Sequence, residues 1–133
     1  MPETLTVTTE IDTKRLASLL CSGFEGGVGY WCQITGYRKP AAPVPHLDGD
    51  DPDGEIYKHI DYPLCEGGAV LCRDIEDEER GTLVLDREAI KRGLALMPTK
   101  AAHQWGRFVA DDYDSDTGDA FLQCCLLGEI VYG

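Results

Sequence analysis

The sequence has few basic residues and no long apolar run. It holds 12 lysines and arginines against 24 aspartates and glutamates, which gives a formal net charge of −12. It has no stretch of about 18 apolar residues, the length that a membrane-spanning helix needs. Its N-terminal part also lacks the basic start and continuous apolar stretch of a secretory signal. These absences predict a cytosolic protein that binds neither membranes nor nucleic acid directly, because a strongly acidic chain repels both.

The sequence also lacks the spaced motifs of common enzymes and metal sites. Its six cysteines include no Cys-x2–4-Cys pair of the kind that zinc sites use, so we expect reduced, buried thiols. Asp112, Asp114 and Asp116 alternate like the start of an EF-hand calcium loop. Thr117 stands where that loop needs glycine, and Gln123 where it needs a bidentate glutamate. We therefore expect no catalytic residue, metal or cofactor, although a hydrolase that uses carboxylates and a divalent metal stays open.

The pattern of apolar and turn-forming residues predicts one α+β domain over residues 1–133, with a short antiparallel sheet packed by about four helices. Alternating apolar residues predict the strands, and apolar residues three and four positions apart predict the helices. The expected strands are 4–9, 28–37, 55–62, 69–74 and 81–85, and the expected helices are 12–24, 86–97, 101–110 and 120–127. Residues 28–37 could form a helix instead, and a last strand at 129–132 stays open. A long loop rich in proline, glycine and aspartate is expected at 38–54.

Three aspartates are expected to begin helices, namely Asp12, Asp86 and Asp119. Pro98 is expected to end the helix that Asp86 begins. The helix after Asp119 is apolar on almost every side, so we expect it to be central and buried. Gln123 lies in that helix, one turn after Asp119, and must find a hydrogen-bond partner or reach the surface. Either a buried role in folding or a contact to a ligand would satisfy it.

The negative charge is concentrated in one part of the chain. Residues 48–79 carry twelve acids and two bases, a net charge of −10, and the other 101 residues sum to −2. Such a segment could imitate the phosphate charge of nucleic acid and occupy a basic groove on a nucleic-acid-binding protein. A segment that only keeps the protein soluble is the alternative. The residues predicted to contact a basic partner are Asp48, Asp50, Asp51, Asp53, Glu76, Asp77, Glu78 and Glu79.

A second candidate site combines glycines, aromatics and bases. Two glycines follow Glu25, the aromatic pair Tyr30 and Trp31 comes next, and Arg38 and Lys39 lie soon after. Glycines let a ligand approach the backbone closely, and aromatic rings stack on flat bases. These five residues are therefore an alternative binding site for a small nucleotide. A tight turn leading into a core strand is the simpler interpretation.

Three parts of the chain form a recognisable set: the stretch from Phe24 to Trp31, the middle helix with Leu94 and Met97, and the ending from Asp119 to Gly133. Together they resemble a group of small acidic proteins encoded by tailed phages and prophages, most weakly between residues 38 and 85. The resemblance implies a phage accessory protein in the bacterial host cytosol. It favours a non-covalent inhibitor of a defence system, similar to an anti-CRISPR protein. The alternatives are a sponge that sequesters a nucleotide immune signal and a phage structural or assembly protein.

Overall fold

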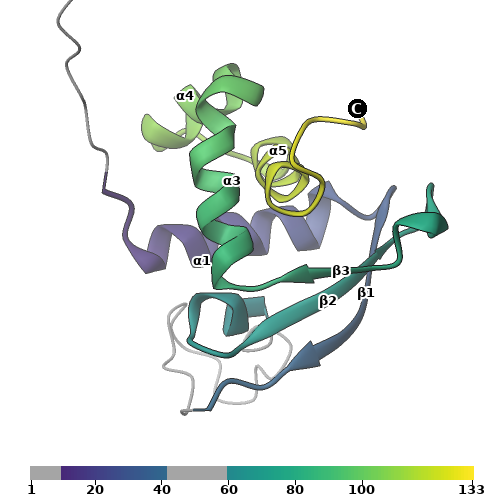
Figure 1. Cartoon of the computed structure of the whole chain (residues 1–133). Helices are drawn as coiled ribbons and strands as arrows, with labels where there is room; N and C mark the ends of the chain where they lie inside the picture. Colours follow the sequence, from purple (N-terminus) through teal and green to yellow (C-terminus); the bar gives the residue numbers. More distant parts are fainter. Residues whose placement is uncertain (1–9, 42–59) are drawn as a thin grey trace, which may run out of the picture.

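The computed structural model describes residues 10–41 and 60–133. Within these residues the chain forms a single α+β domain, as the sequence predicts, with helices packed on one three-stranded antiparallel sheet (Figure 1). The strands are β1 (Cys32–Arg38), β2 (Ala69–Asp74) and β3 (Thr82–Leu85). The α-helices are α1 (Thr13–Ser22), α3 (Arg87–Lys100), α4 (Ala102–Val109) and α5 (Ser115–Leu127), and the shorter turns are η1 (Gly23–Gly27), η2 (Tyr62–Leu64) and η3 (Glu78–Arg80).

Strand β2 is the centre of the sheet. It pairs in antiparallel fashion with β1 on one side and with β3 on the other. Val70 and Cys72 of β2 are fully buried, because the helices cover that face of the sheet. The strands predicted at 69–74 and 81–85 are confirmed. The strand predicted at 28–37 is also a strand, although it begins only at Cys32 because a turn precedes it.

Helix α5 lies in the middle of the domain, against α1, α3 and α4 and above the sheet (Figure 1). Its side chains Phe121, Leu122, Cys124 and Cys125 are fully buried. This confirms that the helix with apolar residues on almost every side is central. Within the described residues, no helix is long and apolar enough to cross a membrane.

Glycines allow α5 to approach α1 more closely than side chains would permit. A Cβ added at Gly118 of α5 would lie 2.5 Å from the backbone nitrogen of Gly23 and 2.6 Å from its Cα. Non-bonded atoms do not approach so closely, so there is no room for a side chain at Gly118. The backbones of α5 and of the Gly23 region are therefore in direct contact. The helix predicted at 12–24 is observed as α1, whose C-cap is Gly23, and the π-helical turn η1 follows it to Gly27. Gly23 and Gly27 pack against α5.

The N-terminus of α5 also differs from the prediction. Its N-cap is Asp114, whose side chain accepts hydrogen bonds from the backbone of Asp116 and Thr117. The hydroxyl of Thr117 in turn accepts from the backbone N–H of Asp114, which completes a capping box. Asp119 therefore lies inside the helix, where it is buried.

Two further boundaries were predicted wrongly, and the structure decides one alternative that was left open. Pro98 was expected to end the helix but lies inside α3, which continues to Lys100. Residues 60–62 are helical rather than extended, and Pro63 lies in the turn that follows, where its fixed φ is compatible. Residues 129–132 form no strand, since side-chain hydrogen bonds hold that segment against α5. The strand predicted at 4–9, residues 42–54 of the predicted loop and residues 55–59 lie outside the described residues.

Candidate functional site

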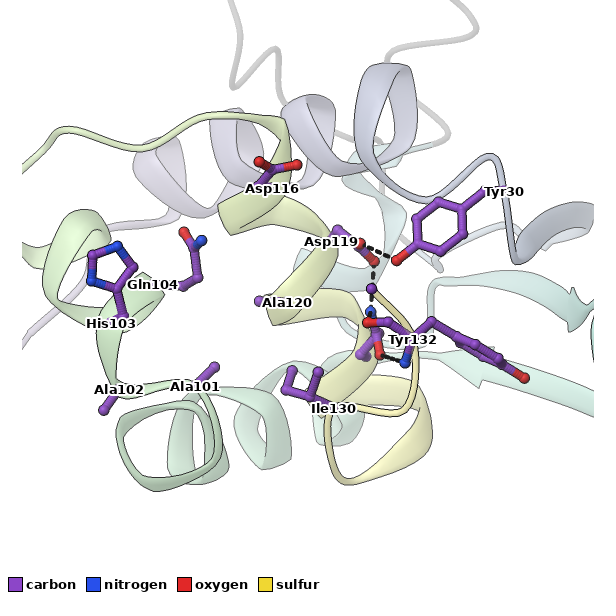
Figure 2. A pocket seen from close by; sticks show the side chains of 12 residues that line it. Tyr30, Ala101, Ala102, His103, Gln104, Asp116, Asp119, Ala120, Ile130 and Tyr132 are labelled. Atoms are coloured by element: carbon purple, nitrogen blue, oxygen red, sulfur yellow. Dashed lines mark hydrogen bonds between the residues drawn. The ribbon is translucent and has the colours of Figure 1, made fainter.

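A pocket of about 600 Å³ opens between the start of α4 and the N-terminal half of α5 (Figure 2). Residues at the α3–α4 junction and in the first turn of α4 form one wall, and α5 forms the floor. Tyr30 and the C-terminal segment close the other side. The lining residues are Tyr30, Ala101, Ala102, His103, Gln104, Asp116, Asp119, Ala120, Gln123, Ile130, Tyr132 and Gly133.

The carboxylate of Asp119 is the centre of a hydrogen-bond network at this pocket. The indole Nε1 of Trp31 donates to its Oδ1 over 2.8 Å, and the amide Nε2 of Gln123 donates to the same oxygen over 3.0 Å. The hydroxyl of Tyr30 donates to Oδ2 over 2.6 Å. Burial, followed by this hydrogen bond, raises the pKa of Tyr30 well above its usual value. Because an indole nitrogen can only donate, Oδ1 is the acceptor of that bond.

Gln123 connects the network to the C-terminal segment. Its Oε1 accepts from the backbone N–H groups of Val131, over 2.8 Å, and of Tyr132, over 2.9 Å. Its Nε2 donates to the carbonyl oxygen of Tyr132 over 3.1 Å, as well as to Asp119. The two backbone donors fix which end of the amide is oxygen, and the side chain is only 1% exposed. The predicted buried role of Gln123 is thus confirmed, and the residue also lines the pocket.

Tyr132 extends the network to the sheet. Its ring stacks on Trp31 with the centroids 5.7 Å apart. Its hydroxyl donates to Oδ2 of Asp74 over 2.7 Å, and Arg80 donates to the same oxygen over 2.9 Å. Asp74 is 1% exposed and also accepts from the backbone N–H of Glu76. A continuous chain of contacts therefore joins the pocket to the turn between β2 and β3.

The pocket is acidic. Among the residues that the structure describes, no lysine or arginine lines it, whereas Asp116 and Asp119 do. Asp119 is 9% exposed, and within the described residues no basic side chain forms an ion pair with it. Its hydrogen-bonding atoms are satisfied by neutral donors, but its charge has no counter-ion there. This combination suits a cationic ligand better than an anionic one.

The structure does not bring together the five residues predicted to bind a nucleotide. Trp31 is fully buried, Tyr30 lines the pocket, and Glu25 is exposed on η1. Arg38 is the last residue of β1 and Lys39 follows it, and the seven residues of this strand span about 20 Å. Arg38 lines a separate pocket of about 410 Å³. The aromatic residues and the bases therefore belong to different parts of the surface.

The acidic residues 76–79 lie in the turn between β2 and β3, which projects beyond the sheet (Figure 1). Glu76, Glu78 and Glu79 are exposed and Asp77 is half-buried. Glu78 pairs with Arg73 over 3.1 Å, and Asp77 pairs with Arg80 over 3.5 Å. Glu76 and Glu79 form no ion pair with a described residue. The other predicted contact residues, Asp48, Asp50, Asp51 and Asp53, lie outside the described residues.

Sequence reasoning missed most of the pocket. The spacing of Asp119 and Gln123 pointed to a pair on one helix, but not to Trp31 or Tyr132 as their partners. The Asp114-x-x-Thr117 capping box was a usable local signal for the true start of α5. It would have placed Asp119 inside the helix and identified it as a polar residue needing partners.

Comparison of the chain with protein-family models, curated proteins and solved structures found no significant match. These comparisons neither support nor contradict the resemblance to phage proteins, which stays a prediction. Among residues 10–41 and 60–133, no group of three or more histidine, cysteine, aspartate or glutamate side chains could hold a metal ion.

Proposed function

We propose that the protein acts by non-covalent binding, and that the acidic turn formed by residues 75–80 contacts a basic surface of its partner. The observation that carries this proposal is the exposure of Glu76 and Glu79, whose charges are not neutralised by any described residue. Carboxylates presented in this way attract a basic surface over long distances and speed its association.

The frame of the acidic turn supports the same proposal. Asp74 accepts hydrogen bonds from the backbone N–H groups of Glu76, over 2.9 Å, and Asp77, over 3.2 Å. The side chains of Arg80 and Tyr132 also donate to it. A turn held by a buried carboxylate loses less conformational freedom on binding than a flexible one. The exposed carboxylates are therefore presented in a pre-organised arrangement.

The partner that best fits these features is a protein whose basic groove normally holds nucleic acid. Within that class, the resemblance to phage proteins favours a nuclease or CRISPR complex of a bacterial defence system, met in the host cytosol. The nucleotide-sponge alternative has less support, because Tyr30 and Arg38 line different pockets and Trp31 is fully buried. A phage structural role is the remaining alternative, and the experiment below distinguishes it.

The test compares two doubly charge-reversed variants of the tagged full chain. Glu76→Lys/Glu79→Lys changes the acidic turn and breaks no ion pair between described residues. Glu10→Lys/Asp112→Lys makes the same change in net charge at exposed positions. Glu10 precedes α1 and Asp112 lies between α4 and α5, so neither control position belongs to the turn. Wild type and both variants are used to capture proteins from a bacterial host lysate, and bound proteins are eluted with salt and identified by mass spectrometry.

The proposal predicts that wild type and the control variant capture the same nucleic-acid-binding protein. The turn variant should lose it, because two charges reverse sign and the net charge at the contact changes by four units. Equal capture by all three proteins would contradict the role of the turn. Capture of other phage structural components instead would favour the structural alternative.

A further inference from the structure

We infer that the pocket between α4 and α5 is a binding site for an organic cation, either an ammonium or a guanidinium group. The inference rests on the proposed function only for the origin of the cation, which a basic partner surface could supply. The affinity of the pocket itself depends on no partner and can be measured on the isolated protein.

Two carboxylates on one face of α5 define the site. Asp116 and Asp119 are three residues apart, so they lie on the same side of the helix, and both line the pocket. Asp116 is exposed, whereas Asp119 is buried and its carboxylate points toward Tyr30 (Figure 2). Ala102, Ala120 and Ile130 supply apolar surface along which an alkyl chain could lie. A cation with a short aliphatic stem matches this arrangement of groups.

The unbalanced charge of Asp119 is the strongest argument. Buried charges in proteins are normally paired with an opposite charge, because removing an ion from water is costly. Asp119 receives hydrogen bonds from Tyr30, Trp31 and Gln123, all of which are neutral donors. No described lysine or arginine approaches it within ion-pair distance. A cation in the pocket would supply the missing counter-charge.

The first turn of α4 is the main opposing influence. Ala101 at its start makes no side-chain cap, and residues of this turn line the pocket, so the helix dipole places a partial positive charge of about half a unit nearby. The two carboxylates contribute about four times as much charge of the opposite sign, and Asp119 lies in a less solvated position. The pocket should therefore select cations over anions.

The volume of the pocket allows either of two origins for the cation. About 600 Å³ is enough for a free diamine or guanidine metabolite, and equally for one basic side chain of a partner protein. Both present the same chemical group to Asp116 and Asp119. Two probes separate them: agmatine represents the free cation, and a capped Gly-Gly-Arg-Gly-Gly peptide represents the side chain.

The experiment is an amide NMR titration of the full chain with each probe, and with succinate as an anionic control. We expect saturable shifts concentrated at Ala102, Gln104 and Ala120 with agmatine or the peptide, and none with succinate. Tighter binding of agmatine would identify a free metabolite. Binding of the peptide that is at least as tight would identify a basic side chain. Absence of saturable shifts with both cationic probes would overturn the inference.

Matched variants test whether the carboxylates are responsible. Asp116→Asn should weaken cation binding about tenfold, because a full charge is lost beside the ligand. Asp112→Asn removes the same charge from an exposed position that does not line the pocket, and should leave the affinity within about twofold. Ala102→Phe should abolish binding by filling the exposed wall, and thermal melting confirms that each variant is folded.

Equal affinities of Asp116→Asn and Asp112→Asn would overturn the inference even if the wild type binds cations. Failure here can be told apart from failure of the proposed function. The first is measured with small cations at the pocket, and the second with the charge-reversed variants of the acidic turn. A protein could pass either test without the other.

Discussion

Replacing Gly118 by alanine should reveal how closely α1 and α5 are packed. The added Cβ would stand 2.5 Å from the backbone nitrogen of Gly23 and 3.0 Å from the carbonyl oxygen of Leu19. Both contacts are to backbone, so no side chain can rotate away. The helices must separate, and the fully buried Leu19, Leu20 and Leu122 would lose part of their packing.

The expected cost follows from two opposing effects. Overpacking a dense core costs about 1–3 kcal/mol, and the rigid backbone contacts put this site at about 3 kcal/mol or slightly above. Alanine is the better helix former by about 1 kcal/mol, which offsets part of that cost. The net loss of unfolding free energy should be about 2 kcal/mol. For a chain of 133 residues this lowers Tm by about 7 °C.

Gly106→Ala is the matched control, because Gly106 also lies in a helix but a Cβ there would meet nothing within 4 Å. This variant should raise Tm by about 3 °C through helix propensity alone. Thermal melts followed by circular dichroism, supported by urea unfolding, measure both. If Gly118→Ala raises Tm as much as Gly106→Ala does, the result would contradict a direct backbone contact between α1 and α5.

Two further predictions concern buried and capping carboxylates. Asp119→Asn should keep the unfolding free energy within about 1 kcal/mol, because the amide oxygen can still accept from Trp31 and the amide nitrogen can donate to the hydroxyl of Tyr30. Asp119→Ala should lower the unfolding free energy by about 3 kcal/mol, because it leaves the indole N–H of Trp31 unpaired. Urea unfolding measures both variants, and equal losses would contradict the hydrogen-bond network. The hydrogen bond from the backbone of Thr117, followed by Arg107, lowers the pKa of Asp114 below its ordinary value of 3.8. Its contribution to stability is therefore complete above that value and is lost as the pH falls through the folded-state pKa. Asp114→Asn should accordingly cost more stability at pH 7 than at about pH 2, and a cost independent of pH would show that the cap does not depend on charge.

The parts of the fold that could be predicted are those that local sequence determines. Asp86 caps α3 through the backbone N–H of Ala89, and the spacing of Ile90 and Met97 places both in the core. The start of α5 was predicted wrongly because Asp114 and Asp119 are both acceptable N-caps by residue type. The choice between them depends on the capping box and on the tertiary partners of Asp119.

The candidate pocket could not be predicted, because no local pattern contains it. Its walls come from Tyr30, from the start of α4, from α5 and from the C-terminal segment, which are far apart in the sequence. Their proximity depends on the packing of α5 and on the hydrogen bonds of Gln123 to Tyr132. Exposure of the acidic turn, by contrast, could be expected from its charge alone.

The most direct test of the proposed function is the salt dependence of binding to the captured partner. If the acidic turn contacts a basic groove, the dissociation constant should rise steeply with salt concentration. Glu76→Lys/Glu79→Lys should flatten this dependence, and Glu10→Lys/Asp112→Lys should preserve it. The nucleic acid that the partner binds should compete with the protein. The same salt dependence for wild type and the turn variant, without competition by nucleic acid, would contradict the proposed function.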